Sequence, residues 1–196
     1  MKIKSVIFDL DGTITKPFFD FDAIRKEMGL VKDSEPILEF MEKMVPNERP
    51  RVEGILKSHE DKAVAESTLN DGAREILGTL RNRSINIGIL TRNKRSNAIA
   101  IAQKHYLHFD AIVGREDGPV KPNAFGVLRL CEYFKTKPAE TLVVGDFLYD
   151  LLSATAAGAI AVLLKTHQNN QKFKEYADFE ISSLDEILKI IEDKYQ

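Results

Sequence analysis

The sequence predicts an α/β fold in which a parallel sheet is covered by helices on both faces. From residue 71 onward, helical and strand patterns alternate. Strands separated by helices need crossover connections, and these connections make neighbouring strands parallel. Residues 15 to about 71, by contrast, read as helices with no convincing strand among them. We therefore expect a sheet that is interrupted, after its first strand, by a small helical bundle.

The first strand is the apolar run Val6-Ile7-Phe8, and it leads directly into two aspartates. Residues i and i+2 of a strand point to the same side, so Asp9 and Asp11 would converge, and Gly12 lets the chain turn after them. Two carboxylates beside an apolar strand repel each other, and a divalent metal is the simplest compensation. The alternative is that Asp11-Gly12 is only a turn and that Asp9 caps the next helix.

Three helices are expected in the insertion, separated by short breaks. Their bounds are, in order, Asp20 or Asp22 to Met28, Ser34 to Met44, and Asn47 to about Ser67. In the third, the apolar residues between Val52 and Ala63 recur at roughly helical spacing and leave charged residues for solvent. The insertion therefore reads as a helical bundle in its own right.

The elements beyond the insertion follow one another without a long break. A helix that opens at Asp71-Gly72 is amphipathic through Leu80, and Ile85 to Leu90 supplies the second strand. The remaining elements are a helix over 96–105, a strand over 111–113, a helix over 124–134, a strand over 141–145, a helix over 150–157, a strand over 159–164 and a helix over 184–191.

Polar side chains follow several of these strands at the point where each strand ends. Asp9 and Asp11 follow the first strand, Thr91 the second, and Asp146 and Asp150 the strand over 141–145. In parallel sheets the reactive groups gather beyond the carboxyl ends of the strands, so we expect these side chains to lie at one edge. Their joint occurrence indicates an active site more strongly than any one of them alone.

These segments resemble the four motifs of the haloacid dehalogenase superfamily, in the right order and over most of the chain. The matching segments are Asp9-Leu10-Asp11-Gly12-Thr13, Thr91, Lys121-Pro122, and Gly145-Asp146 with Asp150. Residues 145–158 are especially similar to the phosphoglycolate-phosphatase-like branch. The resemblance implies a three-layer, Rossmann-like core over 1–14 and 72–196, with an all-helical cap over 15–71 inserted after the first strand.

The resemblance also implies roles for single residues in phosphate chemistry. Asp9 would be the nucleophile that forms an aspartyl-phosphate, and Asp11 the general acid and base. The Thr91 hydroxyl, the backbone N–H of Arg92 and the Lys121 ammonium would bind the phosphoryl oxygens. An acidic residue at position 11 favours phosphate chemistry over dehalogenation, because the dehalogenase branch has no acid at the matching position.

The expected cofactor is Mg²⁺. Its ligands would be the Asp9 side chain, the Asp11 backbone carbonyl and Asp146, with Asp150 near enough to hold the metal or its waters. All-oxygen ligation suits Mg²⁺ rather than zinc. Phe147 departs from the family pattern, which commonly has a small polar residue here, and it could press on the metal site or on the substrate.

The cap would cover the site and select the substrate. Four residues close in sequence to the catalytic loop are candidates for contacting the leaving group: Lys16, Phe18, Phe19 and Arg25. The alternative for the phenylalanines is that they pack the cap against the core, since aromatic clusters usually bury area.

Composition limits the partners. A net charge of -2 over 196 residues gives no electrostatic case for nucleic acid, and no apolar run approaches the ~20 residues that cross a membrane. The N-terminus lacks the features of a secretory signal, so we expect a cytoplasmic protein, monomeric or homodimeric.

The expected function is Mg²⁺-dependent hydrolysis of a phosphomonoester on a small phosphorylated metabolite. A phosphomutase of the β-phosphoglucomutase kind is the alternative, because the same core can return the phosphoryl group to a substrate. A third possibility is a binding or regulatory protein that keeps the fold without turnover. The intact set of Asp9, Asp11, Thr91, Lys121 and Asp146 argues against it.

Overall fold

A computed structural model describes residues 2–31 and 35–194, so the helix start expected at Ser34 lies outside the described residues. The chain divides into two compact units. The larger combines the residues up to Pro17 with those from Thr68 onward, and the smaller is Phe18–Ser67. Residues 15–17 and 68–71 therefore belong to the larger unit, where Thr15 and Leu69 form an antiparallel bridge.

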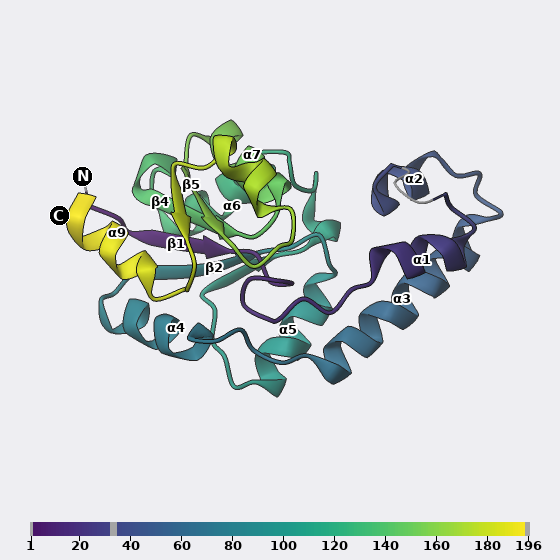
Figure 1. Cartoon of the computed structure of the whole chain (residues 1–196), viewed down its shortest axis with the longest axis horizontal. Helices are drawn as coiled ribbons and strands as arrows, with labels where there is room; N and C mark the ends of the chain where they lie inside the picture. The colour runs from purple at the N-terminus through teal and green to yellow at the C-terminus, as the bar shows by residue number, and fades with distance from the viewer. Residues whose placement is uncertain (1, 32–34, 195–196) are drawn as a thin grey trace. The chain divides into compact units, whose positions relative to one another are not determined.

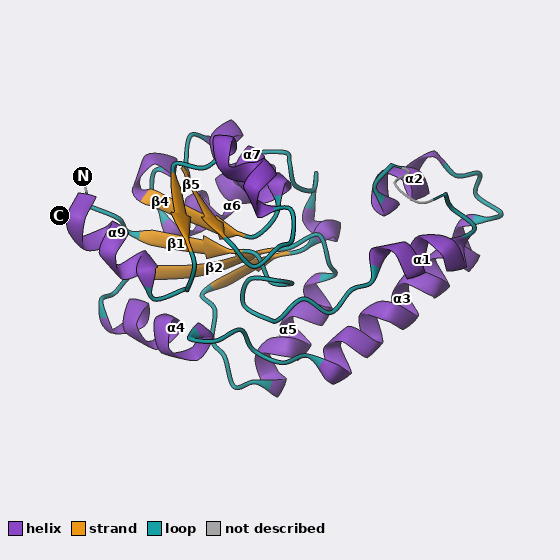
Figure 2. Cartoon of the chain, in the orientation of Figure 1, coloured by secondary structure: helices purple, strands orange, loops and turns teal. Residues whose placement is uncertain are grey.

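The larger unit is built on a sheet, drawn in orange in Figure 2. Its strands are parallel and follow the order β3-β2-β1-β4-β5-β6. The strands are β1 (Ser5–Phe8), β2 (Asn86–Leu90), β3 (Ala111–Val113), β4 (Thr141–Gly145), β5 (Ile160–Leu164) and β6 (Phe179–Ile181). The order reverses between β1 and β4, and open α/β sheets bind ligands beyond the carboxyl ends of strands at such a switch point. Phe8 pairs with Val144 across this point, so the residues that follow both strands emerge together.

Helices cover both faces of the sheet, and this confirms the predicted three-layer α/β fold. They are α4 (Ala73–Asn82), α5 (Arg95–Lys104), α6 (Phe125–Phe134), α7 (Leu148–Ala157), α8 (Asn170–Phe173) and α9 (Glu186–Lys194). Helices α4 and α5 lie on one face, and α6 and α7 on the other (Figure 1). The crossovers through these helices are what make the strands parallel.

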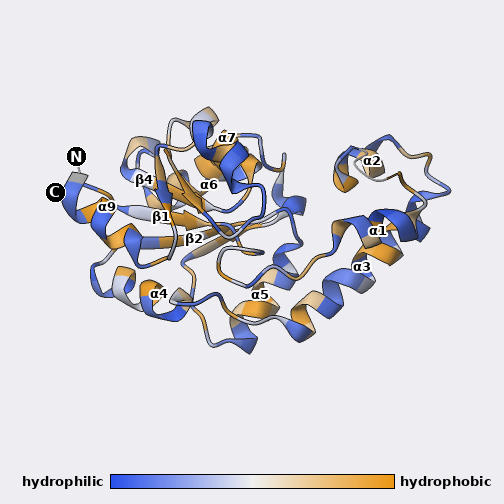
Figure 3. Cartoon of the chain, viewed as in Figure 1, coloured by the Kyte–Doolittle hydropathy of each residue, from blue (hydrophilic) through white to orange (hydrophobic). Residues whose placement is uncertain are grey.

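The core of the larger unit lies between the sheet and its helices. Every residue of β1, β4 and β5 is buried, as expected for parallel strands covered on both faces. Side chains such as Leu130 of α6 and Leu151 of α7 pack on this sheet and are at most 1% exposed. The strands are accordingly largely hydrophobic, while the helices carry both hydrophilic and hydrophobic residues (Figure 3).

Neither the α-helix α8 nor the strand β6 was predicted from the sequence. Strand β6 has three residues, pairs with β5 at the end of the strand order and carries a glutamate, Glu180, at its centre. A strand this short at a sheet edge contains no apolar run from which it could be predicted. It forms because it pairs with β5.

The smaller unit, Phe18–Ser67, contains α1 (Phe21–Met28), α2 (Ile37–Lys43) and α3 (Arg49–Glu66). The Asp20 carboxylate caps α1 by accepting a 2.9 Å hydrogen bond from the N–H of Ala23. Six buried side chains form its own core: Ile24, Met28, Ile37, Met41, Val52 and Leu56. That this unit covers the active site as a cap stays a prediction.

Candidate active site

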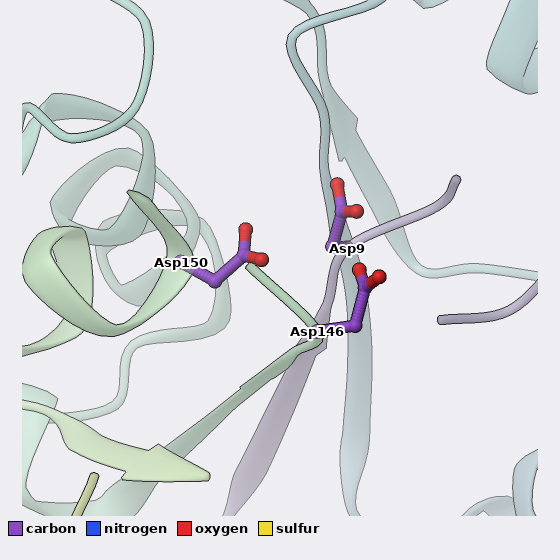
Figure 4. A group of neighbouring side chains, drawn as sticks. All are labelled: Asp9, Asp146 and Asp150. Atoms are coloured by element: carbon purple, nitrogen blue, oxygen red, sulfur yellow. The ribbon is translucent and has the colours of Figure 1, made fainter. Parts of the chain in front are cut away.

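Three aspartates from separate parts of the sequence form one buried cluster at the carboxyl edge of the sheet. Asp9 follows β1, Asp146 follows β4, and Asp150 lies in the first turn of α7 (Figure 4). One carboxylate oxygen from each lies within 4.8 Å of the others. Asp146 is 5% exposed and Asp150 2%, so little water is available to screen their charges.

Lys121 lies between two of these carboxylates. Its Nζ is 2.5 Å from an oxygen of Asp9 and 2.5 Å from an oxygen of Asp150. Burial alone would lower the pKa of Lys121, but the carboxylates of Asp150 and Asp9 outweigh burial and raise this pKa above its usual value. The lysine is therefore a fixed positive charge beside the predicted nucleophile.

One lysine does not neutralise three carboxylates. Burial, and after it the negative charge of Asp150, raise the pKa of Asp146 to about 7. Burial also raises the pKa of Asp9 well above its usual value, although Lys121 opposes this shift. The three carboxylates thus carry more negative charge than Lys121 can neutralise, and the atoms that they offer to a metal are all oxygens. Both properties fit a hard divalent cation such as Mg²⁺.

These raised pKa values predict that the metal-free protein loses stability as the pH rises. In the unfolded chain both carboxyls ionise near their ordinary pKa of about 4, so above this pH the folded state binds more protons than the unfolded state. Unfolding free energy should fall by on the order of a few kcal/mol between about pH 4 and pH 8. Urea unfolding in EDTA, repeated across this pH range, measures the free energy of unfolding. Asp146→Asn should flatten the profile, and a profile that rises with pH would contradict the raised values.

Asp150 holds Lys121 in place as well as contributing to the cluster. One of its oxygens contacts Lys121 Nζ, and the other accepts a 3.1 Å hydrogen bond from the N–H of Phe147 at the start of α7. Arg92 donates from Nη1 to the backbone carbonyl of Lys121. Both the head group and the backbone of the lysine are therefore fixed.

Thr91 follows β2, which lies beside β1 in the sheet. It is 3% exposed, and its N–H donates to the carbonyl of Val113 over 3.0 Å. Its Oγ1 accepts a 3.0 Å hydrogen bond from the N–H of Asn93. This contact uses a lone pair, so the hydroxyl proton can be donated to an anion.

Asp11 lies in the loop after β1 and is half-buried, and whenever Asp11 is ionised its charge raises the pKa of Asp9 further. The next residue, Gly12, has a φ of 93°. A Cβ at Gly12 would lie 2.4 Å from an Asp146 oxygen, so the loop can lie against this carboxylate only with glycine there. Thr13 Oγ1 donates to Asp146 over 3.4 Å. The loop after β1 and Asp146 are thus packed together.

Residues 3–158 match the family model of the haloacid dehalogenase-like hydrolases. The chain belongs to this family. An uncharacterized hydrolase of Saccharomyces cerevisiae is 32% identical over 97% of this chain and 91% of its own length. The phosphoglycolate phosphatase of Chromobacterium violaceum is 28% identical over 82% of this chain and 84% of its own. The predicted superfamily is therefore confirmed, and the chain is an enzyme.

A solved structure shows the same fold. A hydrolase from Pseudomonas syringae superposes on this haloacid dehalogenase-like chain with a TM-score of 0.83, at 20% identity, covering 98% of this chain and 100% of that one.

None of the described helices is both long and apolar enough to span a bilayer.

Gly145, at the end of β4, lets the Asp150 carboxylate of this haloacid dehalogenase-like hydrolase approach the strand. A Cβ at this position would lie 2.2 Å from that carboxyl group. Gly145→Ala should displace Asp150 from Lys121, and lower both Mg²⁺ affinity and turnover by about tenfold or more. Titration of activity with Mg²⁺ measures the effect. The control is Gly78→Ala in α4, where a Cβ meets nothing within 4 Å. Wild-type behaviour of Gly145→Ala would contradict the expected displacement.

The four candidates for contacting the leaving group lie in different surroundings. Lys16 is exposed in the larger unit, with its Nζ 3.0 Å from an Asp71 carboxylate oxygen. The other three lie in the smaller unit. The Phe18 and Phe19 rings meet edge to face at 6.3 Å, and Arg25 Nη1 lies 3.7 Å from Asp22. Their contact with substrate stays a prediction.

Phe147, which departs from the family pattern, belongs to an aromatic cluster. Its ring centroid lies 5.1 Å from that of Tyr149 and 5.2 Å from those of His167 and Phe173. Such edge-on contacts stabilise the turn between β4 and α7. The Phe147 side chain thus anchors the segment that carries Asp146 and Asp150.

Two polar residues outside the motifs hold the loop after β1, and neither was predicted from the sequence to do so. Asn70 donates from Nδ2 to the carbonyls of Gly12 and Thr13, and Thr166 donates from Oγ1 to the carbonyl of Gly12. They lie 58 and 154 residues from Gly12 in the sequence. No local pattern could have indicated contacts over such separations.

Proposed function

We propose that the protein is a Mg²⁺-dependent phosphatase that hydrolyses phosphomonoesters of small metabolites through an aspartyl-phosphate on Asp9. The observation that carries this proposal is the buried Asp9 beside a fixed Lys121 cation, within one cluster with Asp146 and Asp150. The family match and the relative named a phosphoglycolate phosphatase support phosphatase chemistry.

The residues that would hold Mg²⁺ are Asp9, Asp146 and Asp150, together with the backbone carbonyl of Asp11. When bound, the metal would neutralise charge on the phosphoryl oxygens and so permit the approach of the Asp9 anion. Lys121 would also neutralise charge on the phosphoryl oxygens, because its ammonium group lies beside Asp9.

In the first half of the reaction, an Asp9 oxygen attacks phosphorus and the bond to the leaving oxygen breaks. Asp11 gives its proton to that oxygen, so the product leaves as an alcohol. The Thr91 hydroxyl, the Arg92 N–H and Lys121 bind the phosphoryl oxygens as their charge rearranges. The group left on the enzyme is an acyl phosphate at Asp9.

In the second half, Asp11 takes a proton from water while the water oxygen attacks phosphorus. The bond between phosphorus and the Asp9 oxygen breaks, inorganic phosphate leaves, and Asp9 returns as a carboxylate. Asp11 ends protonated, as it began. One acid at position 11 therefore serves both halves of the cycle.

The substrate would be a small phosphorylated metabolite, and Lys16, Phe18, Phe19 and Arg25 remain the proposed contacts for its leaving group. A cytoplasmic location and a monomer or homodimer belong to the same proposal. Phosphate release from a panel of phosphorylated metabolites, with Mg²⁺ and with EDTA, tests it. Metal-dependent release by the wild type and none by Asp9→Asn is the expected result. Transfer of the phosphoryl group to a sugar without release would instead indicate a mutase.

A further inference from the structure

The loop that carries Asp11 is a tight turn whose own hydrogen bonds run between its ends. The N–H groups of Ile14 and Thr15 donate to the carbonyl of Leu10, and the N–H of Gly12 donates to the carbonyl of Thr15. None of these bonds uses the carbonyls of Gly12 and Thr13 as acceptors. Both carbonyls need donors from elsewhere in the fold.

Asn70 supplies a donor to each of them. Its Nδ2 lies 3.1 Å from the carbonyl oxygen of Gly12 and 3.0 Å from that of Thr13. The amide orientation follows from these contacts, because the opposite orientation would set Oδ1 against two carbonyl oxygens. One side-chain NH₂ group therefore bridges the two peptide groups that follow the predicted general acid.

The backbone of Asn70 is itself fixed against the same loop. Its N–H donates a 2.9 Å hydrogen bond to the carbonyl of Ile14, and its carbonyl accepts a hydrogen bond from the N–H of Ala73 at the start of α4. The N–H of Lys16 donates 2.9 Å to the carbonyl of Thr68. The chain that leaves the loop and the chain that returns at Asn70 thus form a short two-stranded ribbon, and the amide group is held in place before substrate arrives.

We propose that Asn70 is a positioning residue that sets the orientation of Asp11 for proton transfer. This inference rests on the proposed function of Asp11 as general acid and base. Asn70 itself touches no reacting atom. It acts by holding the peptide groups of Gly12 and Thr13, which determine where the Asp11 carboxyl lies relative to Asp9 and to the leaving oxygen.

The consequence is specific to the proton that Asp11 transfers. Asn70→Ala leaves the Asp9, Lys121 and Asp146 side chains unchanged, but removes both hydrogen bonds that Asn70 donates to the loop. The Thr13 carbonyl loses the donor described above, whereas the Gly12 carbonyl keeps the hydroxyl of Thr166. An alkoxide leaving group needs the proton of Asp11, whereas a p-nitrophenolate leaving group departs without it. Loss of positioning should therefore slow the first half of the reaction with alkyl phosphates far more than with p-nitrophenyl phosphate.

Single-turnover leaving-group release tests this inference, with an alkyl phosphate and p-nitrophenyl phosphate in Mg²⁺. Asn70→Ala should slow the alkyl substrate by about tenfold to a hundredfold and the aryl substrate by less than about threefold, the pattern expected also of Asp11→Asn. The control is Asn86→Ala, which removes a 3.2 Å hydrogen bond from an asparagine Nδ2 to the carbonyl of Lys4 at the opposite end of the strands. It should leave both rates unchanged.

Hydrogen exchange of the loop amides gives a readout that does not depend on activity. Asn70→Ala should speed exchange at Gly12, Ile14 and Thr15 and leave that of β1 unchanged, while Asn86→Ala should change none of these. Equal slowing of both substrates, or unchanged loop exchange, would overturn the positioning role. Wild-type protein without activity on either substrate would instead refute the proposed function.

Discussion

Asp9→Asn is expected to reduce turnover by at least ~10⁴-fold, because an amide cannot replace a carboxylate as the attacking nucleophile. The substitution is nearly isosteric, so the fold should be kept. It also removes one negative charge from a buried cluster with three carboxylates. The metal-free variant should therefore be at least as stable as the wild type at neutral pH.

Steady-state phosphate release and thermal unfolding in EDTA measure the two effects. Asp110→Asn is a suitable control, since Asp110 lies before β3, where its carboxylate accepts from the N–H of Ile87 at the start of β2. That variant should retain activity. Appreciable turnover in pure Asp9→Asn protein would remove Asp9 from the role of nucleophile.

Lys121→Met is expected to have the second-largest effect, on both turnover and stability. It leaves Asp9 and Asp150 without their shared cation, and breaking a buried ion pair on one side typically costs about 3–5 kcal/mol. Turnover should fall by about 10²- to 10³-fold, because a charge aimed at the phosphoryl oxygens is lost.

A second variant separates the two effects of this substitution. Lys121→Met combined with Asp150→Asn removes one of the stranded charges, so it should recover part of the lost stability without recovering turnover. Urea unfolding in EDTA and phosphate release with Mg²⁺ measure these quantities. If Lys121→Met alone unfolds like the wild type, the ion pairs at 2.5 Å do not stabilise the site.

Much of the larger unit could be predicted from its sequence, because buried parallel strands leave clear marks. The apolar runs that became β1, β2, β4 and β5 are each bounded by turns and separated by amphipathic helices. The reactive residues follow those strands directly, so the sheet topology alone brings Asp9, Thr91 and Asp146 to one edge. That these residues meet at one edge of the sheet thus follows from local sequence patterns and from the rule that crossover connections make strands parallel.

The remaining features depend on contacts between distant residues. Strand β6 exists because β5 offers an open edge, and Asp150 holds Lys121 through a contact across 29 residues. The bonds from Asn70 and Thr166 to Gly12 involve a side-chain donor and a backbone carbonyl. Such pairs leave no periodicity or motif in the sequence, and only the folded chain reveals them.

Chemical trapping shows whether Asp9 is the residue that carries the phosphoryl group. Asp11→Asn protein, in which breakdown of the intermediate should be slow, is mixed with p-nitrophenyl phosphate and Mg²⁺, quenched in acid and reduced with borohydride. Reduction converts an aspartyl-phosphate to homoserine, which mass spectrometry locates. We predict homoserine at position 9, and none when Mg²⁺ is replaced by EDTA. Release of p-nitrophenol with an unmodified Asp9, or trapping at another carboxylate, would contradict the mechanism.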